Sequence, residues 1–286
     1  MHIPKCFLMK PTGWVPIMVL SIIFSFSCER KKPIILDHWE AFDFRDTKAL
    51  ETPEIGEQHL VDFLSLMKNE AEDIQVAAFR NLLDHAVIHA QAFAFFQEKM
   101  PHYLNDPRSP MYDHELFGAY LKAIQQSKQV SLEEKLKQQV LLEQVHKNQP
   151  GSIAASFFFE LENGKTSSLQ QVHGQCIILL FFDPTCAHCQ ESILALKKQQ
   201  DFANLLADRK STFLMINPWG NYPAWKTFIK DLPENWVIGY DRPEAILKNG
   251  LYYLQASPSI YLLNKNREVL LKNTSIPVII DYLASH

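Results

Sequence analysis

The sequence predicts an all-α domain followed by an α/β domain, and three observations support this. Residues from about 37 to 147 contain few glycines and many helix formers, with apolar side chains recurring at helical spacing. Asn148-Gln-Pro-Gly-Ser152 then breaks that pattern. After the break, short apolar runs of strand length alternate with helical segments, as in sheets whose strands are joined by helices.

The composition is that of a globular protein. The chain has 286 residues, enough for one large or two ordinary domains. Hydrophobic residues make up 47% and charged residues 21%, which excludes a disordered chain. A formal net charge of −4 gives no reason to expect nucleic acid as a partner. Five cysteines are too few for a scaffold held together by disulfides.

The first residues form a targeting segment. Lys5 and Lys10 precede an uncharged apolar stretch, which ends at Ser25-Phe-Ser-Cys28 before the charged Glu29-Arg-Lys-Lys32. A basic start, a short apolar region and small residues predict a signal peptide over residues 1–27. The apolar run is shorter than the roughly 20 residues that a membrane-spanning helix needs.

The residues around Cys28 resemble the lipobox of bacterial lipoproteins, although Ser25 stands where leucine is usual. The resemblance implies that Cys28 is lipidated and that residues 28–36 tether the protein to a membrane, in the cell envelope and facing the periplasm or the surface. An uncleaved anchor and an ordinary cleaved signal are the alternatives. All three place the body of the protein outside the cytoplasm, where disulfide chemistry is possible.

Residues 37–147 are expected to be helical. The predicted helices are Gln58–Lys68, Glu70–Lys99, Asp113–Lys128 and Leu132–Lys147. Met100-Pro101 is expected to end the second helix and Ser131 to cap the last one. His85 and His89 are spaced i, i+4 on the expected long helix, but no third ligand is evident, so no metal site is predicted.

Residues 148–286 are expected to form the α/β domain. The predicted strands are Ala155–Leu161, Thr166–Leu169, Cys176–Phe182, Thr212–Asn217, Trp236–Tyr240, Ser259–Leu263 and Val269–Lys272. The predicted helices are Cys186–Gln200, Tyr222–Leu232, Pro243–Lys248 and Ile276–Ser285. This order is a thioredoxin-like layout.

Cys186-Ala-His-Cys189 lies where a buried strand meets a helix. Unpaired N–H groups and the positive dipole end of a first helical turn favour a thiolate over a thiol. Cys186, nearer the terminus, is therefore the predicted attacking thiol and Cys189 the predicted resolving thiol. His188 supplies a nearby positive charge that favours the Cys186 thiolate. Cys176 opens the strand and is expected to be buried and inert.

Three segments of the α/β half resemble the TlpA/ResA group of envelope thiol–disulfide oxidoreductases: Phe181-Phe-Asp-Pro-Thr-Cys-Ala-His-Cys189, Asn163-Gly-Lys165 and Ala256-Ser-Pro-Ser-Ile-Tyr-Leu-Leu263. The helical half resembles a domain of unknown function that precedes such domains in Bacteroidetes envelope proteins. His38-Trp-Glu-Ala-Phe-Asp-Phe44 and Tyr103-Leu-Asn-Asp-Pro-Arg-Ser-Pro110 carry that resemblance.

The resemblance implies a cis proline at Pro258 that faces the cysteine pair, with the backbone of Ser257 free to pair with an extended substrate. An ordinary trans turn proline is the alternative. The chain departs from the pattern at Leu180, because such proteins often carry a buried acid six residues before the first cysteine. Proton transfer at the resolving thiol is therefore unassigned. Trp219 and Trp225 fit either the border of a substrate groove or the core.

These observations predict an envelope thiol–disulfide oxidoreductase that acts on protein thiols and disulfides without a cofactor. Its electron donor or acceptor, and the direction of electron flow, are not evident from the sequence. One alternative is a thiol peroxidase, although Thr185 is adjacent to Cys186 and not three residues before it. The other is a surface lipoprotein that binds a partner and uses the two cysteines only as a structural disulfide.

Overall fold

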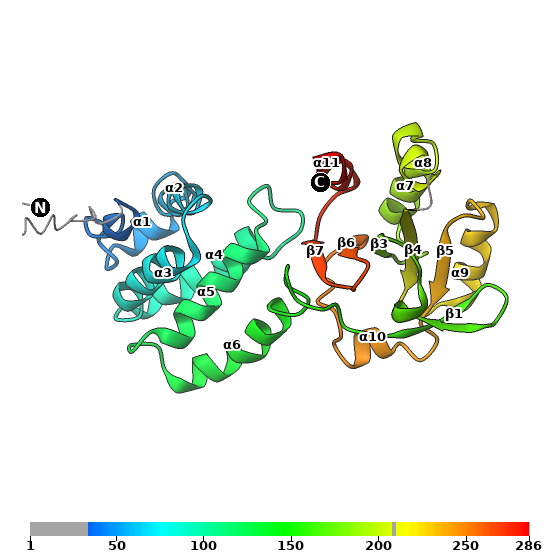
Figure 1. Ribbon diagram of the computed structural model, residues 1–286. Helices are drawn as coiled ribbons and strands as arrows, with labels where there is room; N and C mark the ends of the chain where they lie inside the picture. The colour runs from blue at the N-terminus through cyan, green and yellow to red at the C-terminus, as the bar shows by residue number, and fades with distance from the viewer. Residues whose placement is uncertain (1–33, 208–209, 286) are drawn as a thin grey trace, which may run out of the picture. The chain divides into compact units, whose positions relative to one another are not determined.

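An all-helical segment precedes a mixed α/β segment in the computed structural model, which describes residues 34–207 and 210–285 (Figure 1). This confirms the predicted fold class. The predicted signal peptide and the predicted lipidation site at Cys28 lie outside the described residues. Within the described residues, no helix is long and apolar enough to span a bilayer.

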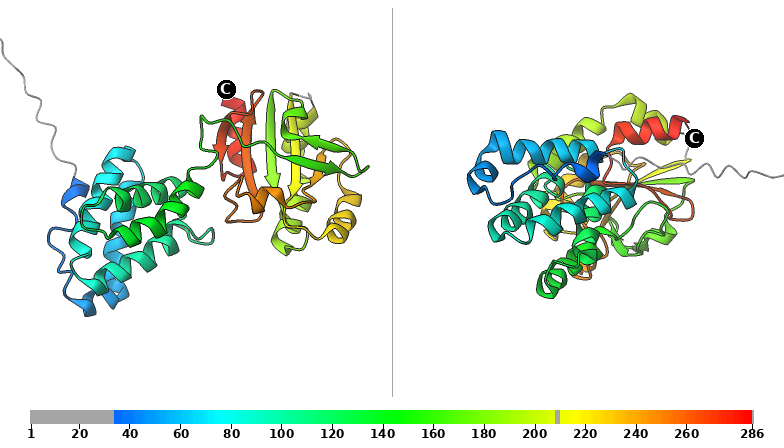
Figure 2. Two further views of the ribbon diagram at one scale, coloured as in Figure 1. Left: turned by 90° about the horizontal axis from the view of Figure 1, so that it is seen from below. Right: turned by 90° about the vertical axis from the view of Figure 1, so that its left-hand side faces the viewer.

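The helical segment begins with two short turns and one short helix and continues with longer helices. Its elements are η1 (Ile34–Asp37), α1 (Thr47–Glu51), η2 (Pro53–Glu57), α2 (Gln58–Met67), α3 (Glu72–Ala86), α4 (Ala90–Leu104), α5 (His114–Gln126) and α6 (Leu132–Val145). Helices α3, α4 and α5 pack against one another (Figure 2). Trp39 lies in the core that they share with α2, only 1% exposed, with Phe63 and Phe96 in edge-to-face contact with its ring.

The prediction of one long helix over Glu70–Lys99 is wrong. The chain turns at residues 87–89, and His89 has extended backbone angles at the start of α4. Val87, Ile88 and His89 are weak helix formers, so a break there costs little. It allows α3 and α4 to fold back and bury Phe79 and Phe96 in one core. As a consequence, His85 and His89 do not lie on one helix.

The predicted helix end at Met100-Pro101 is also wrong, because α4 continues through Pro101 to Leu104. An internal proline removes one backbone hydrogen bond. The additional turn is held by tertiary contacts: Leu104 is fully buried, and the Tyr103 hydroxyl donates a hydrogen bond to Glu57 at 2.6 Å. The last two helices begin as expected. Asp113 caps α5, and the Ser131 hydroxyl accepts a hydrogen bond from the Glu134 N–H at the start of α6.

Across the described residues, the strands form one sheet in the order β2-β1-β5-β4-β3-β6-β7. Its strands are β1 (Phe158–Leu161), β2 (Thr166–Ser168), β3 (Cys176–Phe181), β4 (Ser211–Asn217), β5 (Val237–Tyr240), β6 (Ser259–Asn264) and β7 (Val269–Lys272). β3 is parallel to β4 and antiparallel to β6. The strand that leads to the cysteine pair is thus hydrogen-bonded on both sides.

Helices cover both faces of the sheet. Because alternate residues of β3 point to opposite sides, this strand contributes side chains to the core on each face. They are α7 (Ala187–Leu196), α8 (Gln200–Ala207), α9 (Tyr222–Phe228), α10 (Ala245–Lys248) and α11 (Ile276–Ser285), with the 3₁₀ turns η3 (Leu169–Gln171) and η4 (Ile229–Asp231). Ile178 and Leu180 pack with α7, α8 and α11 on one face, whereas Ile177 and Leu179 pack with α10 on the other (Figure 1). The helix predicted over Cys186–Gln200 ends at Leu196, and α8 follows it as a separate helix.

We expect Gly239→Ala and Gly118→Ala to change stability in opposite directions. A Cβ at Gly239 would lie 2.4 Å from Phe159 Cδ2 and 2.7 Å from Ile216 Cδ1, which is an overpacked site in β5. A Cβ at Gly118 in α5 would meet Val145 Cγ1 at an ordinary 3.5 Å. Gly239→Ala should therefore cost about 1–3 kcal/mol, and Gly118→Ala should gain about 0.5–1 kcal/mol by removing backbone freedom.

Thermal unfolding of both variants and the wild type checks this pair. A Gly239→Ala protein that melts at or above the wild-type temperature would show that the sheet has room at this position.

Candidate functional site

Cys186 is the N-cap residue of helix α7. After β3, Asp183 Oδ1 accepts hydrogen bonds from the Thr185 N–H at 2.8 Å and the Thr185 hydroxyl at 2.7 Å, which closes the loop before the helix. Cys186 has extended backbone angles, and its Sγ accepts a hydrogen bond from the Cys189 N–H at 3.4 Å. The Cys186 sulfur itself therefore occupies the N-cap position, where unpaired N–H groups stabilise negative charge.

The two cysteines lie in different environments. Cys186 is partly exposed at the surface, whereas Cys189 is fully buried one turn further into α7. Burial raises the pKa of the Cys189 thiol to about 11, while hydrogen bonds from Ser257 and from the Asp183 backbone act in the opposite direction. At neutral pH, Cys189 is therefore a thiol. Cys186 is thus the accessible sulfur and Cys189 the enclosed one. Their roles as attacking and resolving thiols stay predictions.

Ser257, two residues before β6, contacts both cysteines. Its peptide bond to Pro258 is cis. The Ser257 carbonyl oxygen lies 3.9 Å from Cys186 Sγ, and the Ser257 hydroxyl lies 2.9 Å from Cys189 Sγ. The same hydroxyl accepts a hydrogen bond from the Asp183 N–H at 3.0 Å. The sequence predicted a role for the Ser257 backbone but did not predict the contact of its hydroxyl with Cys189. The signal that could have indicated this contact was a hydroxyl residue directly before the proline.

A shallow groove of about 390 Å³, lined by both apolar and polar side chains, lies beside the cysteine pair. Its walls come from α7, from the start of β6 and from the first residues of α11, and include His188, Pro258 and Ile276. Leu180 lines the groove and is only 2% exposed, so the position of the buried acid is apolar. The His188 side chain is exposed at this groove.

Other candidate residues lie away from this site. Cys176 opens β3, about 17 Å of extended strand before the loop that leads to Cys186, and burial raises the pKa of its half-buried thiol. Trp225 is fully buried in the core between the sheet and α7, and Trp219 is half-buried on the opposite face. Among the described residues, no group of three or more His, Cys, Asp or Glu is arranged to hold a metal.

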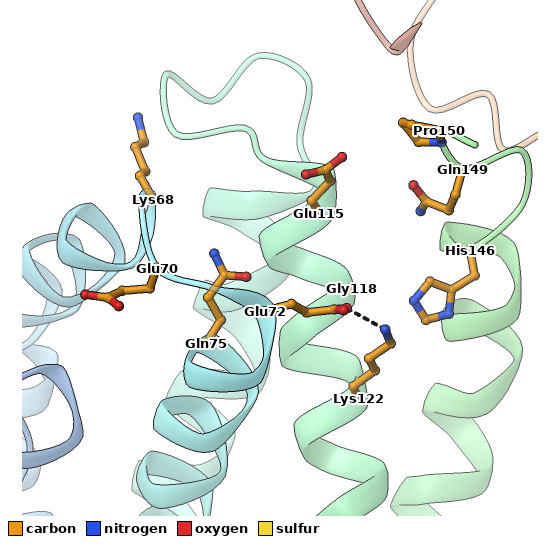
Figure 3. A pocket seen from close by; sticks show the side chains of 10 residues that line it. All are labelled: Lys68, Glu70, Glu72, Gln75, Glu115, Gly118, Lys122, His146, Gln149 and Pro150. Carbon is orange, nitrogen blue, oxygen red and sulfur yellow. Dashed lines mark hydrogen bonds and ion pairs between the residues drawn. The ribbon is translucent and has the colours of Figure 1, made fainter. Parts of the chain in front are cut away.

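A polar pocket of about 440 Å³ lies in the helical segment (Figure 3). Carboxylate, amide and cationic side chains line it, from α3, α5, the residues before α3 and those after α6, and Glu72 and Lys122 form an ion pair there. Desolvation by burial lowers the pKa of His146, whose ring faces Lys122. The predicted site residues all lie elsewhere.

Known proteins are similar to both the helical and the α/β segment of this chain. A domain of unknown function (DUF5106) matches residues 22–148. The structure superposes on a thioredoxin-like protein from Bacteroides caccae with a TM-score of 0.81 and 31% identity, covering 88% of this chain and 91% of that chain. The chain belongs to this thioredoxin-like family.

Two solved structures from Bacteroides fragilis are similar over part of this thioredoxin-like chain. One is a conserved protein of unknown function, with 30% identity and a TM-score of 0.45, covering 47% of this chain and 98% of that chain. The other is the C-terminal domain of an uncharacterized protein, with 34% identity and a TM-score of 0.46, covering 48% of this chain and 98% of that chain. No curated protein matches the sequence significantly.

We expect Cys186 to react first when the reduced thioredoxin-like protein meets a small alkylating reagent at neutral pH. It is partly exposed and capped by a backbone N–H, whereas Cys189 is buried with a pKa near 11 and burial also raises the pKa of Cys176. Peptide mass spectrometry after short labelling times measures the order. Labelling of Cys189 or Cys176 before Cys186 would contradict the environments described above.

Proposed function

We propose that this protein is a thiol–disulfide oxidoreductase that acts on protein thiols and disulfides through Cys186 and Cys189. One observation carries the proposal: a partly exposed sulfur caps a helix N-terminus, and a buried thiol lies one turn behind it. Dithiol exchange needs both parts, since the first sulfur must meet a client and the second must reach the resulting mixed disulfide.

In the reducing direction, the Cys186 thiolate attacks one sulfur of a client disulfide. The client's S–S bond breaks, a mixed disulfide forms with Cys186, and the first client sulfur leaves and takes up a proton. Cys189 then attacks Cys186 Sγ, which closes the Cys186–Cys189 disulfide and releases the second client sulfur as a thiol. Two electrons pass from the protein dithiol to the client. Oxidation of a client dithiol is the same sequence in reverse.

The surroundings of Cys186 suit a protein client. The Ser257 backbone lies against the Cys186 sulfur and offers a main-chain partner for an extended client segment. The adjacent groove presents apolar side chains to the client. We assign His188 the role of a cation at the mouth of this groove, where its protonated form would favour the Cys186 thiolate.

We also propose that the protein works in the cell envelope, attached through lipid on Cys28. This rests on the signal-like residues 1–27 and on the small residues before Cys28. An oxidising compartment is where disulfide exchange on proteins is needed. A separate donor or acceptor of electrons must then regenerate the Cys186–Cys189 pair after each turnover.

The two alternatives are less well supported by the site. In a peroxidase, a threonine hydroxyl would assist the cysteine, but the Thr185 hydroxyl donates to Asp183 Oδ1. A purely structural disulfide does not need a partly exposed sulfur beside a groove. The polar pocket between α3, α5 and α6 favours an additional binding role for the helical segment, which is compatible with exchange at Cys186.

We expect Cys189→Ala to accumulate mixed disulfides with envelope proteins, because the covalent adduct at Cys186 then has no resolving thiol. Cys186→Ala should trap nothing, and Cys176→Ala should behave as wild type, which makes it the matched control. Non-reducing electrophoresis followed by mass spectrometry measures the adducts. A structural disulfide would instead give no adducts and a reduction potential below about −300 mV.

We expect Cys28→Ser to move the protein from the membrane fraction to the soluble fraction. Without the thiol there is no acceptor for the lipid, and no described helix can span the bilayer. Fractionation and labelling with a radioactive fatty acid measure the change. Unchanged membrane association together with absent lipid in the wild type would favour an uncleaved anchor.

A further inference from the structure

The resolving cysteine lies in an apolar environment that opposes its ionisation. Cys189 belongs to the cluster formed by Leu180, Ile193 and their neighbours beneath α7. Leu180 is apolar and buried at the position where the family resemblance implies a carboxyl group. Because the thiolate is the nucleophile in disulfide exchange, some other group must stabilise negative charge on Cys189 during resolution.

The Ser257 hydroxyl is placed to do this. It lies 2.9 Å from Cys189 Sγ, and it accepts a hydrogen bond from the Asp183 N–H at 3.0 Å. A hydroxyl carries one hydrogen and two acceptor lone pairs. Since the Asp183 N–H occupies one lone pair and fixes the oxygen in place, the hydroxyl hydrogen and the second lone pair are both available to the sulfur.

The strand register explains why this contact forms. β3 and β6 pair with Phe181 opposite Ser259. The two chains continue past this last pair towards Asp183 and Ser257, and the Asp183 N–H donates a hydrogen bond to the Ser257 hydroxyl. The first turn of α7 then carries Cys189 over the same oxygen. The hydroxyl is thus held between the loop that follows the central strand and the helix that carries the thiol.

We propose that the Ser257 hydroxyl donates a hydrogen bond to the Cys189 thiolate during resolution and so replaces the missing acid. This deepens, and rests on, the proposed exchange function. In the resting dithiol, the hydroxyl accepts from the Cys189 S–H; on ionisation it rotates and donates to the sulfur. The Cys189 proton passes to the departing client thiolate, the Cys186–Cys189 bond forms, and the bond between Cys186 and the client breaks. Ser257 gains and loses no proton.

Neighbouring charged groups do not provide this stabilisation. The Asp183 carboxylate accepts hydrogen bonds from Thr185, and it is the Asp183 backbone, not this carboxylate, that acts on Cys189. The Cys186 thiol is in contact with Cys189 and opposes its ionisation. His188 is exposed. The side chains that β3 contributes beneath the helix, Ile178 and Leu180, are apolar.

Single-turnover reaction of the reduced protein with the aromatic disulfide dithiobis(nitrobenzoate) separates the two steps. Attack by Cys186 releases one coloured thiolate, and resolution by Cys189 releases the second. In Ser257→Ala we expect the second phase to slow about tenfold, the size expected for losing a hydrogen bond to a charged group, while the first phase stays within about twofold of wild type. The pH profile of the second phase should shift to higher pH.

Two further variants separate this role from a structural one. Ser257→Thr keeps the hydroxyl and should restore the second phase. Ser259→Ala removes a hydroxyl on the other side of Pro258, which donates to the Ala256 carbonyl and not to sulfur, and should leave both phases unchanged. The inference is overturned if Ser257→Ala resolves at the wild-type rate, if both phases slow equally, or if Ser257→Thr fails to restore the rate. A wild type without any second phase would instead refute the proposed function.

Discussion

The pairing register between β3 and β6 is the constraint on which the site depends. Phe181 lies opposite Ser259. The loop that follows β3 and the loop that precedes β6 therefore meet at the same end of these two strands. A slip of one residue would turn every side chain of β3 to the opposite face. It would also break the contacts of the Ser257 hydroxyl with the Asp183 N–H and with Cys189 Sγ. The buried faces on both sides of β3 hold the register and therefore the positions of both sulfurs.

This register produces an asymmetric pair of thiols. Cys186 caps α7 at the surface, and Cys189 lies beneath it in the apolar cluster between α7 and the sheet. The same burial that encloses the second thiol raises its pKa, which would slow the resolving step that we propose for it. Below a pH of about 11 the Cys189 thiolate is the minor form, so resolution should become faster as the pH rises. A hydroxyl at Ser257 eases this conflict without introducing a buried charge.

The helical segment uses its distinctive residues for packing. Trp39, in the stretch that carries its resemblance to the domain of unknown function, is buried among aromatic rings. Leu104, in the second such stretch, is also buried. Both residues therefore belong to the core of this segment. Its polar pocket, lined by Glu72, Lys122 and His146, is formed by side chains that the sequence patterns did not single out.

The sequence by itself determined the features that depend on neighbouring residues. The alternation of apolar runs and helical spacing predicted the order of elements, the cap at Ser131 predicted the start of α6, and the position of Cys186 before a helical pattern predicted which thiol lies at the terminus. Tertiary packing decided the rest. It broke the helix at His89 and carried α4 past Pro101, because burying apolar side chains outweighs a local preference of about 1–3 kcal/mol.

The contact between the Ser257 hydroxyl and Cys189 was likewise beyond the sequence patterns, since its partners are 68 residues apart. Helix caps and strand alternation follow from residues a few positions apart. A hydrogen bond across the sheet exists only once the register of β3 and β6 is set.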